Sequence, residues 1–337
     1  MPDSAPSMHG KRILVTGVGA QPGFDLARYL QRLNHRVICT DAQPLAPGLL
    51  LPDVTAHVTP RADDPAYGAA LLRICEESEP HAIVAGIEND LFPLLRLREA
   101  LTRIGVRTWL PDTTSVETCL DKTAFHDVLT QAGIPTPPTR LPDQLHELPS
   151  DGGLVVKPRR GHGGQNVYFC RTHAQARVLC ELVPEPMVQQ RVTGAEFTAD
   201  CLVDREGTAS AVLRWRNLVK GGLAVVSTTF HDEEADRVVK QTLSAVGAVG
   251  LCCVQGFIDD TAPDRVRITE LNVRVAGGFA VSEAAGADLI GQCVNGLLGR
   301  TIDHERLAYR SGIFLTKYVE TLVSGPRSAL ATVPEVC

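Results

Sequence analysis

The segment ITELNVRVAGG, residues 268–278, carries the strongest indication of fold and chemistry in this chain. Glu270, Asn272 and Arg274 alternate there with apolar residues, so a β-strand would turn all three polar side chains to one face. Such groups are costly to bury without partners. Carboxylate and amide oxygens are the ligands that Mg²⁺ prefers, and a guanidinium binds a phosphoryl group or carboxylate bidentately. The alternative is a surface strand with an ordinary ion pair.

The region around this segment is predicted to be α+β, in two lobes. From Gly153 onward the strands are long and alternate strictly between apolar and polar residues, which is typical of antiparallel sheets. The predicted strands are Phe197–Val203, Ala209–Trp215, Leu251–Asp259 and Arg265–Val273. The predicted helices are Thr172–Glu181, Asp232–Val246 and Ala287–Leu298.

A glycine-rich stretch follows a strand that ends in a lysine. Leu154–Pro158 is apolar apart from Lys157, and RRGHGGQNV comes directly after it. A lysine at a strand end can reach a phosphate as a point charge. Gly161, Gly163 and Gly164 let backbone N–H groups approach phosphate oxygens without a side-chain clash. Because a strand resumes after the loop, we predict a flexible lid over phosphates; a hairpin with a loose turn is the alternative.

The first part of the chain alternates short apolar strands with helices. The predicted strands are Arg12–Thr16, Arg36–Thr40, Asp53–Thr59 and His81–Ala85, and predicted helices lie between or after them, at 65–78 and 91–103 among others. This alternation predicts a parallel sheet with right-handed crossovers. We therefore expect a Rossmann-like α/β domain over residues 11–118.

The turn after the first strand, GVGAQPG at residues 17–23, invites comparison with dinucleotide-binding loops. The fingerprint G-x-G-x-x-G needs glycine where Pro22 stands. No tyrosine is followed by lysine four residues later, as short-chain dehydrogenases require. Asp41, after the second strand, would suit a ribose diol, but acids end strands for many reasons. NAD binding is therefore disfavoured, and two interpretations stay open: a loop that lines a substrate cleft, or a tight strand-to-helix turn.

The domain organisation follows from these changes in pattern. A helix over Asp121–Ala132 and a proline-rich linker separate the first domain from the strand-rich region. We predict a disordered tail at 1–10, an α/β domain at 11–118, a small lobe with the glycine-rich lid at 119–192, a large lobe with a metal site at 193–323, and a loose tail at 324–337.

The composition limits the classes of function. The 337 residues have a formal net charge of -6, which argues against a general nucleic-acid binder. No apolar run approaches the roughly 18 residues of a membrane span, and the first ten residues lack the apolar core of a signal peptide. The ten cysteines include no C-x-x-C pair, which favours buried, reduced thiols. We predict a cytoplasmic protein with no nucleic-acid or membrane partner.

The order and spacing of the motifs resemble the ATP-grasp superfamily over residues 11–320. The resemblance is closest to the synthetase halves of the carbamoyl-phosphate synthetase large subunit and to related single-copy carboxylate–amine ligases. The motifs are LDKTAFHDVLTQAGIPTP at 120–137, the lysine and glycine lid, MVQQRVTGAEF at 187–197, VQGFID at 254–259 and ELNVR at 270–274. The resemblance implies a Rossmann-like pre-ATP-grasp domain followed by a two-lobed ATP-grasp domain.

The resemblance also implies a role for each matching residue. The residues implied to bind ATP are Lys122, Lys157, Gly161, Gly163, Gly164, Gln189, Gln190, Val192 and, on the ribose hydroxyls, Glu196. The implied ligands of two Mg²⁺ (or Mn²⁺) ions are Gln255, Glu270 and Asn272. The implied catalytic residues are Arg274 and Lys157. Two positions depart from the pattern: Gln190 stands where many members have an acid, and Val273 stands where proline is common.

Candidate substrate contacts come from position in the predicted fold. They are Glu88, Arg214, Arg216, Lys220, Gly277, Gly278 and Glu283. Glu88 follows a strand of the first domain together with Asn89 and Asp90, and the carboxyl ends of parallel strands face clefts. Helix N-capping by Asn89 or Asp90 is the alternative there. For the basic residues the alternative is a solvated edge.

The activity that the resemblance implies is ATP-dependent ligation. A carboxylate, with that of an amino acid as the leading candidate, attacks the γ-phosphate to give an acyl phosphate and ADP. An amine then displaces phosphate and forms an amide. The alternatives are bicarbonate activation, an intramolecular cyclo-ligase, and a non-catalytic nucleotide-binding module. The partners would be small-molecule carboxylate and amine substrates, and relatives favour a homodimer as the candidate assembly.

Overall fold

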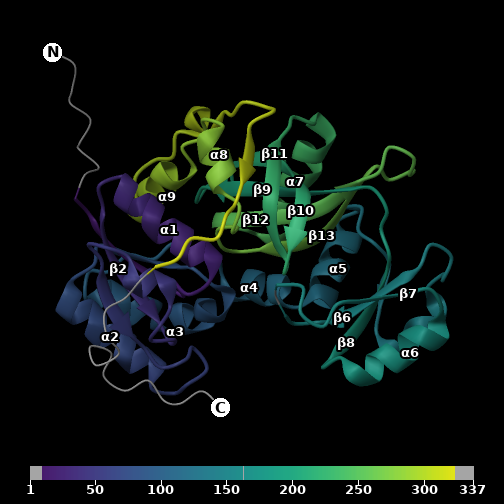
Figure 1. The fold of residues 1–337 in the computed structure, drawn as a ribbon, viewed down its shortest axis with the longest axis horizontal. Coiled ribbons are helices and arrows are strands. Elements are labelled where there is room, and N and C mark those ends of the chain that lie inside the picture. The colour runs from purple at the N-terminus through teal and green to yellow at the C-terminus, as the bar shows by residue number, and fades with distance from the viewer. Residues whose placement is uncertain (1–9, 162, 323–337) are drawn as a thin grey trace. The chain divides into compact units, whose positions relative to one another are not determined.

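The computed structural model describes residues 10–161 and 163–322 (Figure 1). The predicted tails at 1–9 and 324–337 lie outside these residues. The described chain divides into two compact units. The first contains the chain up to Leu110, Ile290–Ile302 and the residues from Tyr318; the second contains Pro111–Leu289 and Asp303–Lys317. The chain thus leaves the first unit after Leu110, returns to it for Ile290–Ile302, and returns again from Tyr318.

The first unit contains a four-stranded parallel sheet, in the order β3-β2-β1-β4. The strands are β1 Arg12–Thr16, β2 Arg36–Asp41, β3 Thr55–Val58 and β4 Ala82–Ala85. The helices are α1 Gln21–Arg32, α2 Tyr67–Ser78, α3 Leu91–Arg103 and nearly all of α9 Leu289–Leu297, with short 3₁₀ turns at Pro47–Leu50 and Glu88–Asp90. The predicted parallel α/β architecture is confirmed.

The glycine-rich turn after β1 is a place of close backbone packing. A side chain on Gly23 would lie 2.4 Å from the carbonyl oxygen of Gly17, and one on Gly86 would lie 2.2 Å from that of Thr16. Only glycine permits these approaches. They let α1 bury Leu26 and Leu30 beside the sheet. The geometry supports the interpretation of this segment as a tight strand-to-helix turn.

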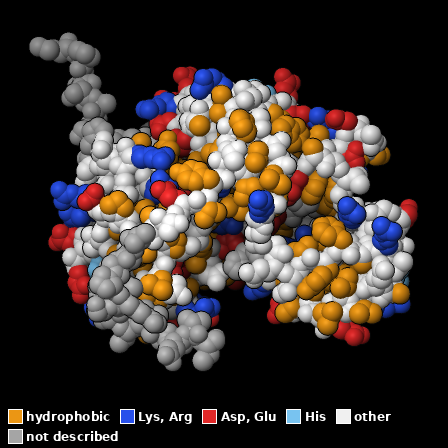
Figure 2. Space-filling view, viewed as in Figure 1, with side chains coloured by type: hydrophobic (Ala, Val, Ile, Leu, Met, Phe, Trp, Pro, Cys, Tyr) orange, Lys and Arg blue, Asp and Glu red, His pale blue; other side chains and the backbone are white. Residues whose placement is uncertain are grey.

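The second unit begins with two helices and a small antiparallel sheet, which form the small lobe. The helices are α4 Thr113–Leu120 and α5 Lys122–Gln131, and α6 His173–Leu182 packs on the sheet. The strands, in the order β5-β8-β6-β7, are β5 Thr139–Arg140, β8 Pro186–Gln190, β6 Leu154–Pro158 and β7 Tyr168–Cys170. Exposed apolar side chains gather over β7 and α6 (Figure 2); they include Phe169, Val178 and Leu182.

A six-stranded antiparallel sheet forms the large lobe of the second unit, in the order β13-β12-β9-β10-β11-β14. The strands are β9 Ala195–Val203, β10 Ala209–Lys220, β11 Leu223–Thr229, β12 Gly250–Ile258, β13 Val266–Asn272 and β14 Phe314–Thr316. The helices are α7 Glu233–Val246 and α8 Ala280–Ala284, with a 3₁₀ turn at His304–Leu307. The predicted two-lobed α+β region is confirmed, although β5, β8, β11, β14, α4 and α8 were not predicted.

Two properties of the whole described chain bear on function. All nine described cysteines are free thiols, and eight of them are buried. No helix among residues 10–161 and 163–322 is long and apolar enough to cross a membrane.

Candidate active site

A row of polar side chains crosses one face of the large sheet. Residues paired in register across neighbouring strands point to the same face of a sheet. In this sheet Glu270 of β13 pairs with Gln255 of β12, which pairs with Thr198 of β9. Thr198 pairs with Arg214 of β10, and Arg214 with Thr229 of β11. The polar face defined by these five residues spans five strands.

The three predicted metal ligands lie on this polar face. Asn272 follows Glu270 on β13 and pairs with Cys253 of β12, one alternation away from Gln255. Asn272 is buried, whereas Gln255 and Glu270 are partly exposed. The structure therefore brings one carboxylate and two carboxamides together on adjacent strands.

This donor set suits Mg²⁺ shared with a polyphosphate. The part of the chain that the structure describes contains no cluster of three or more His, Cys, Asp or Glu side chains placed for a metal ion. Mg²⁺ does not need one, because it is usually held by one or two carboxylates with phosphate and water oxygens. Thr198 Oγ1, paired in register with Gln255, is buried without a hydrogen-bond partner among the described residues. An oxygen-rich ligand would supply one.

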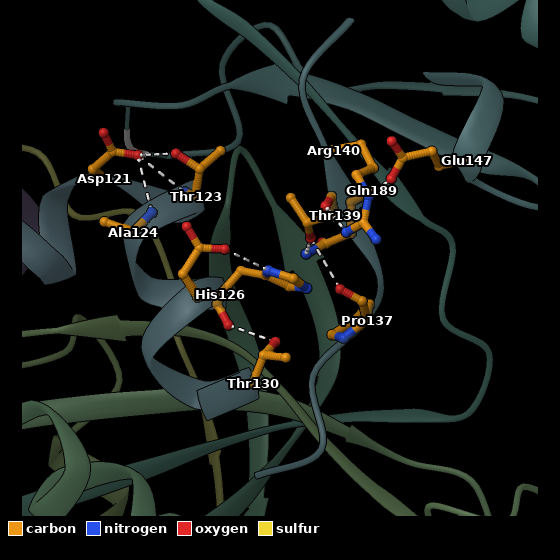
Figure 3. A network of polar contacts seen from close by, with 11 residues as sticks. Asp121, Thr123, Ala124, His126, Thr130, Pro137, Thr139, Arg140, Glu147 and Gln189 are labelled. Atoms are coloured by element: carbon orange, nitrogen blue, oxygen red, sulfur yellow. Dashed lines mark hydrogen bonds and ion pairs between the residues drawn. The ribbon is translucent and has the colours of Figure 1, made fainter. Parts of the chain in front are cut away.

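Lys157 is held by a chain of hydrogen bonds in the small lobe. Its Nζ donates to Gln189 Oε1 (3.0 Å). Gln189 Nε2 donates to Thr139 Oγ1 (2.8 Å), which donates to the carbonyl of Pro137 (Figure 3). Burial lowers the pKa of Lys157 to about 8, although the negative charge of Glu270 acts in the opposite direction and raises it. Gln189, predicted to contact adenine, therefore positions the lysine in this structure.

Lys122 lies at the first turn of α5, beside the predicted metal ligand Glu270. Its Nζ donates to the carbonyl of Gly161 (2.8 Å) and lies 3.8 Å from Glu270 Oε1. Lys122, Lys157 and Glu270 thus form one charged cluster that includes the start of the glycine lid.

Asp121 and Arg159 fix the positions of these two lysines, and neither was predicted. The Asp121 carboxylate caps α5 by accepting from Thr123 N–H (Figure 3), and it accepts from Arg159 Nη2 at 2.5 Å. Although burial raises its pKa, the hydrogen bonds from Arg159 and Thr123 bring the pKa of Asp121 down to about 2. Lys122 N–H donates to the carbonyl of Arg159, so α5 and the end of β6 are joined directly. The aspartate at the start of the predicted helix Asp121–Ala132 was the available signal.

The glycine lid rests against the turn between β10 and β11. Gly163 and Gly164 have φ angles of +65° and +69°, which favour glycine. A side chain on Gly222, in that turn, would lie 2.6 Å from the Gly163 backbone. Arg216 Nη2 donates to the Gly222 carbonyl (2.9 Å), while its Nε lies 3.0 Å from Glu196 Oε1. The predicted ribose ligand and the lid are therefore connected through Arg216.

Arg214 is committed to a buried ion pair. Its guanidinium donates to both carboxylate oxygens of Asp200, at 2.8 and 3.1 Å, and Ser282 Oγ donates to the same carboxylate (2.6 Å). Arg214 also packs against Gly278, where a side chain would lie 2.6 Å from its Nη1. The predicted substrate contact at Arg214 thus supports the glycine pair that follows β13.

Arg274 lies just beyond β13, partly exposed. Its Nη1 donates to the carbonyl of Val275 (3.1 Å) and approaches Cys253 Sγ (3.8 Å). Cys253 pairs in register with Asn272, so the guanidinium lies close to the predicted metal ligands.

The remaining predicted residues of the second unit lie at the ends of elements. Gln190 ends β8, where its N–H donates to the carbonyl of Pro138, and Val192 follows it. Lys220 ends β10 and is exposed. Gly277 precedes α8, and Glu283 lies within it.

A second polar group lies in the first unit, where β4 ends. Glu88 and Asp90 are both buried in the 3₁₀ turn there. Asp90 directly precedes α3, but its side chain does not cap the helix, so the alternative of side-chain capping by Asp90 is wrong. The carboxylate instead accepts from Tyr67 OH (3.1 Å), because burial favours a partner inside the unit. Burial raises the pKa of Asp90 to about 6.

Family models match both units. Residues 183–321 match the model described as ATP-grasp in the biosynthetic pathway with Ter operon. The chain carries an ATP-grasp domain. Residues 13–109, which include the parallel sheet, match the PylC-like N-terminal domain. The ATP-grasp resemblance seen in the motifs is therefore confirmed, together with the domain that precedes it.

Three known proteins resemble this chain. Formate-dependent phosphoribosylglycinamide formyltransferase of Dechloromonas aromatica is 30% identical over 167 residues, which cover 48% of this chain and 40% of the relative. N5-carboxyaminoimidazole synthetase from Staphylococcus aureus, complexed with ADP, has a TM-score of 0.71 at 17% identity and covers 88% of this chain and 79% of its own. An L-amino acid ligase from Bacillus licheniformis has a TM-score of 0.70 at 19% identity, covering 91% and 78%.

These similarities differ in what they establish. At such low identities the two solved structures show the ATP-grasp fold alone. This chain spans 40% of the length of each of the two formyltransferases that it matches.

Proposed function

We propose that this protein is an ATP-dependent ligase that activates a small-molecule carboxylate as an acyl phosphate and joins it to an amine. The observation that carries the proposal is the charged cluster of Lys122, Lys157 and Glu270. It lies between the glycine lid and the metal-ligand strands of an ATP-grasp domain. Two cations beside an oxygen-donor set suit a polyphosphate with its divalent ion.

The protein's part in phosphoryl transfer is positioning and charge neutralisation. Lys122 and Lys157 neutralise the α- and β-phosphates, and Arg274 holds the carboxylate or the transferring phosphoryl group. Mg²⁺ or Mn²⁺, two ions in our proposal, would be held by Gln255, Glu270 and Asn272 and would offset charge on the β- and γ-phosphates. The glycine lid excludes water, which would hydrolyse an acyl phosphate.

The proposed reaction has two steps. A carboxylate oxygen attacks the γ-phosphorus, and the bond from that phosphorus to the β–γ bridging oxygen breaks, releasing ADP. The lone pair of a neutral amine then attacks the acyl carbon. The carbon–oxygen bond to phosphate breaks, phosphate leaves with the electron pair, and the amine nitrogen loses a proton. No redox partner is needed.

Nucleotide recognition follows from the small lobe and its neighbour β9. We propose that Gln189 and Gln190 at the end of β8, with Val192 just after it, contact adenine, and that Glu196 takes the ribose hydroxyls. The carboxylate of Glu196 has two oxygens, so it can accept from a ribose hydroxyl while Arg216 stays paired with it. Gly161, Gly163 and Gly164 would cover the phosphates.

The residues that contact the substrates are proposed from their positions in the fold. Gly277, Gly278 and Glu283 follow the metal-ligand strand and lie next in sequence to Arg274, while Arg216 and Lys220 line β10. In the first unit, Glu88 is a candidate contact for a cationic amine. An amino acid carboxylate is the substrate class that we propose, and a homodimer is the proposed assembly.

The test couples ADP release to chemical trapping of the intermediate. The protein, Mg²⁺ and ATP are incubated with pools of amino acids and small carboxylic acids, with and without hydroxylamine, and products are identified by mass spectrometry. We expect ADP release that depends on one acid and a hydroxamate of that acid, and then an amide when pooled amines replace hydroxylamine. ADP release that needs only bicarbonate would transfer the protein to the bicarbonate-activating class.

Glu270→Gln should abolish ADP release, because the metal site loses its carboxylate. Glu233→Gln, an exposed glutamate at the start of α7, is the matched control and should be fully active. Equal loss in both variants, or no loss in either, would refute the assignment of the metal site.

A further inference from the structure

The first unit contains a cavity of about 230 Å³ at the edge of its sheet where the strands begin. Lys11 directly precedes β1, and His81 directly precedes β4. The backbone of Arg107 bridges to Ala82 beside them. The side chains and backbone that line the cavity belong to Lys11, His81, Gly105, Arg107, Leu298 and Arg300. The glycine-rich turn and Glu88 lie at the opposite end of these strands, because they follow the last residues of β1 and β4.

The lining of this cavity is positively charged and has no acidic member. Lys11, Arg107 and Arg300 are cationic at neutral pH. Within residues 10–161 and 163–322, the side chains of Lys11 and Arg300 make no hydrogen bond or ion pair. Arg107 uses Nη1 to donate to the carbonyl of Leu298, which fixes its guanidinium and leaves its remaining N–H groups for another acceptor. Three cations in one hollow repel each other unless an anion joins them.

His81 adds a neutral donor to the same cavity. Its Nδ1 accepts the backbone N–H of Arg12 (3.1 Å). Burial, with the charges of Lys11 and Arg12, lowers the pKa of His81. The neutral ring therefore carries its proton on Nε2. It can donate a hydrogen bond without adding to the positive charge.

Two helix ends near the cavity do not cancel this charge. The carbonyls of the last turn of α3 accept from Gly105 and Val106, and those of α9 accept from the residues at 298–300. Each helix C-terminus contributes at most about half a negative charge. Three full positive charges therefore leave the cavity with a surplus of about two.

We propose that this cavity binds a small phosphate-bearing anion of the size of phosphate or diphosphate. Two guanidinium groups, one ammonium and one imidazole N–H offer donors on several elements, which suits the oxygens of a tetrahedral anion better than the single plane of a carboxylate. No aromatic side chain apart from His81 lines the cavity, and its volume is below that of pockets for drug-sized ligands. The ligand is therefore the bare phosphate group, without a nucleobase.

The site is independent of the proposed ligase activity. All of its lining residues belong to the first unit, and none is a predicted ATP, metal or substrate contact. Binding of phosphate here requires no catalytic turnover. A negative result in the ADP-release assay would not contradict the anion site. Likewise, failure of the anion to bind would not contradict the proposed ligase activity.

The experiment is calorimetric titration of the full-length protein with inorganic pyrophosphate, without divalent ions. Lys11→Gln and Arg300→Gln should each weaken binding about tenfold, because each removes one charge-assisted contact. Arg103→Gln is the matched control: it removes an exposed arginine in the last turn of α3 that does not line the cavity. It should leave the affinity unchanged. Melting temperatures of all three variants establish that they are folded.

Three results would overturn the proposal. The first is equal pyrophosphate affinity in wild type, Lys11→Gln and Arg300→Gln, which would place the anion elsewhere. The second is absence of binding to the wild type up to about 10 mM. The third is displacement of pyrophosphate by citrate at lower concentration than by phosphate, which would make the site one for carboxylates.

Discussion

ATP affinity should fall as pH rises above 8, because Lys157 changes charge there. Burial lowers the pKa of Lys157 to about 8; Glu270 opposes this shift and Lys122 adds to it. Below pH 8 the lysine is already protonated and ready to bind a phosphate. Above pH 8 the ligand-free protein holds a neutral amine, and a bound polyphosphate must draw a proton onto it.

The size of the effect follows from the two pKa values. A bound polyphosphate returns the lysine toward its ordinary pKa of about 10.5, so the bound form keeps the proton at pH 9. With a free-protein pKa of about 8, the dissociation constant rises about tenfold between pH 7 and pH 9. At pH 9 the protein should take up about 0.9 proton for each ATP bound.

The assay is calorimetry in EDTA at pH 7, 8 and 9, in pairs of buffers with different ionisation enthalpies, so that proton uptake is measured directly. Lys157→Met removes the titrating group and serves as the baseline for protonation of ATP itself. Lys240→Met removes a lysine that pairs with Asp236 on the surface of α7 and should keep the wild-type profile. A wild-type affinity that changes with pH no more than that of Lys157→Met would refute the reasoning.

Three further substitutions test other parts of the site. Gly222→Ala should reduce kcat/KM for ATP about tenfold or more, because the new methyl group would clash with the backbone of the lid. Gly207→Ala is the control, since Gly207 has a similar positive φ but open space around it, and it should leave kcat/KM unchanged. Asp200→Ala should destabilise the protein by about 3–5 kcal/mol in urea unfolding, because it leaves the Arg214 guanidinium buried without its carboxylate; adding Arg214→Met should recover much of that loss. Asp121→Ala should lower the melting temperature through loss of the α5 cap and raise KM for ATP, since the neighbouring lysine loses its anchor.

Alternation along β12 and β13 was enough to predict the strands that carry the proposed metal ligands. Glu270 and Asn272 are separated by one apolar residue, and a strand has only two faces. The pairing of Gln255 with Glu270 needed the register, which the sequence of either strand alone does not contain. The motif resemblance compensated, because it assigned both residues to one site before the register was known.

The large sheet was less predictable at its other edge. β14 has only three residues and pairs with β11 from a distant part of the chain. Such pairing leaves almost no local pattern, because it depends on tertiary contacts. β10 continues to Lys220, beyond the predicted end at Trp215, because its partner β11 extends the hairpin to the glycine turn.

Side-chain partners were the least predictable part of the site. Arg214 looks like a surface residue in sequence, since arginine is rarely buried unless paired. Its partner Asp200 lies on the neighbouring strand, at an inward position of an otherwise apolar run. That buried aspartate was a usable signal. By contrast, Gln189 and Lys157 meet only because β6 and β8 pair.

The polar face and the charged cluster beside it are energetically incomplete without a ligand, and this supports their proposed role. Thr198 Oγ1 is buried without a partner among the described residues, and Lys157 is a cation whose protonated form is disfavoured by burial. Each costs folding free energy. Proteins keep such costs where function requires them. The negative charge of a polyphosphate would stabilise protonated Lys157. The ion or the water bound with the polyphosphate would give Thr198 Oγ1 a hydrogen-bond partner. Nucleotide should therefore raise the free energy of unfolding by the amount that its concentration and its dissociation constant set.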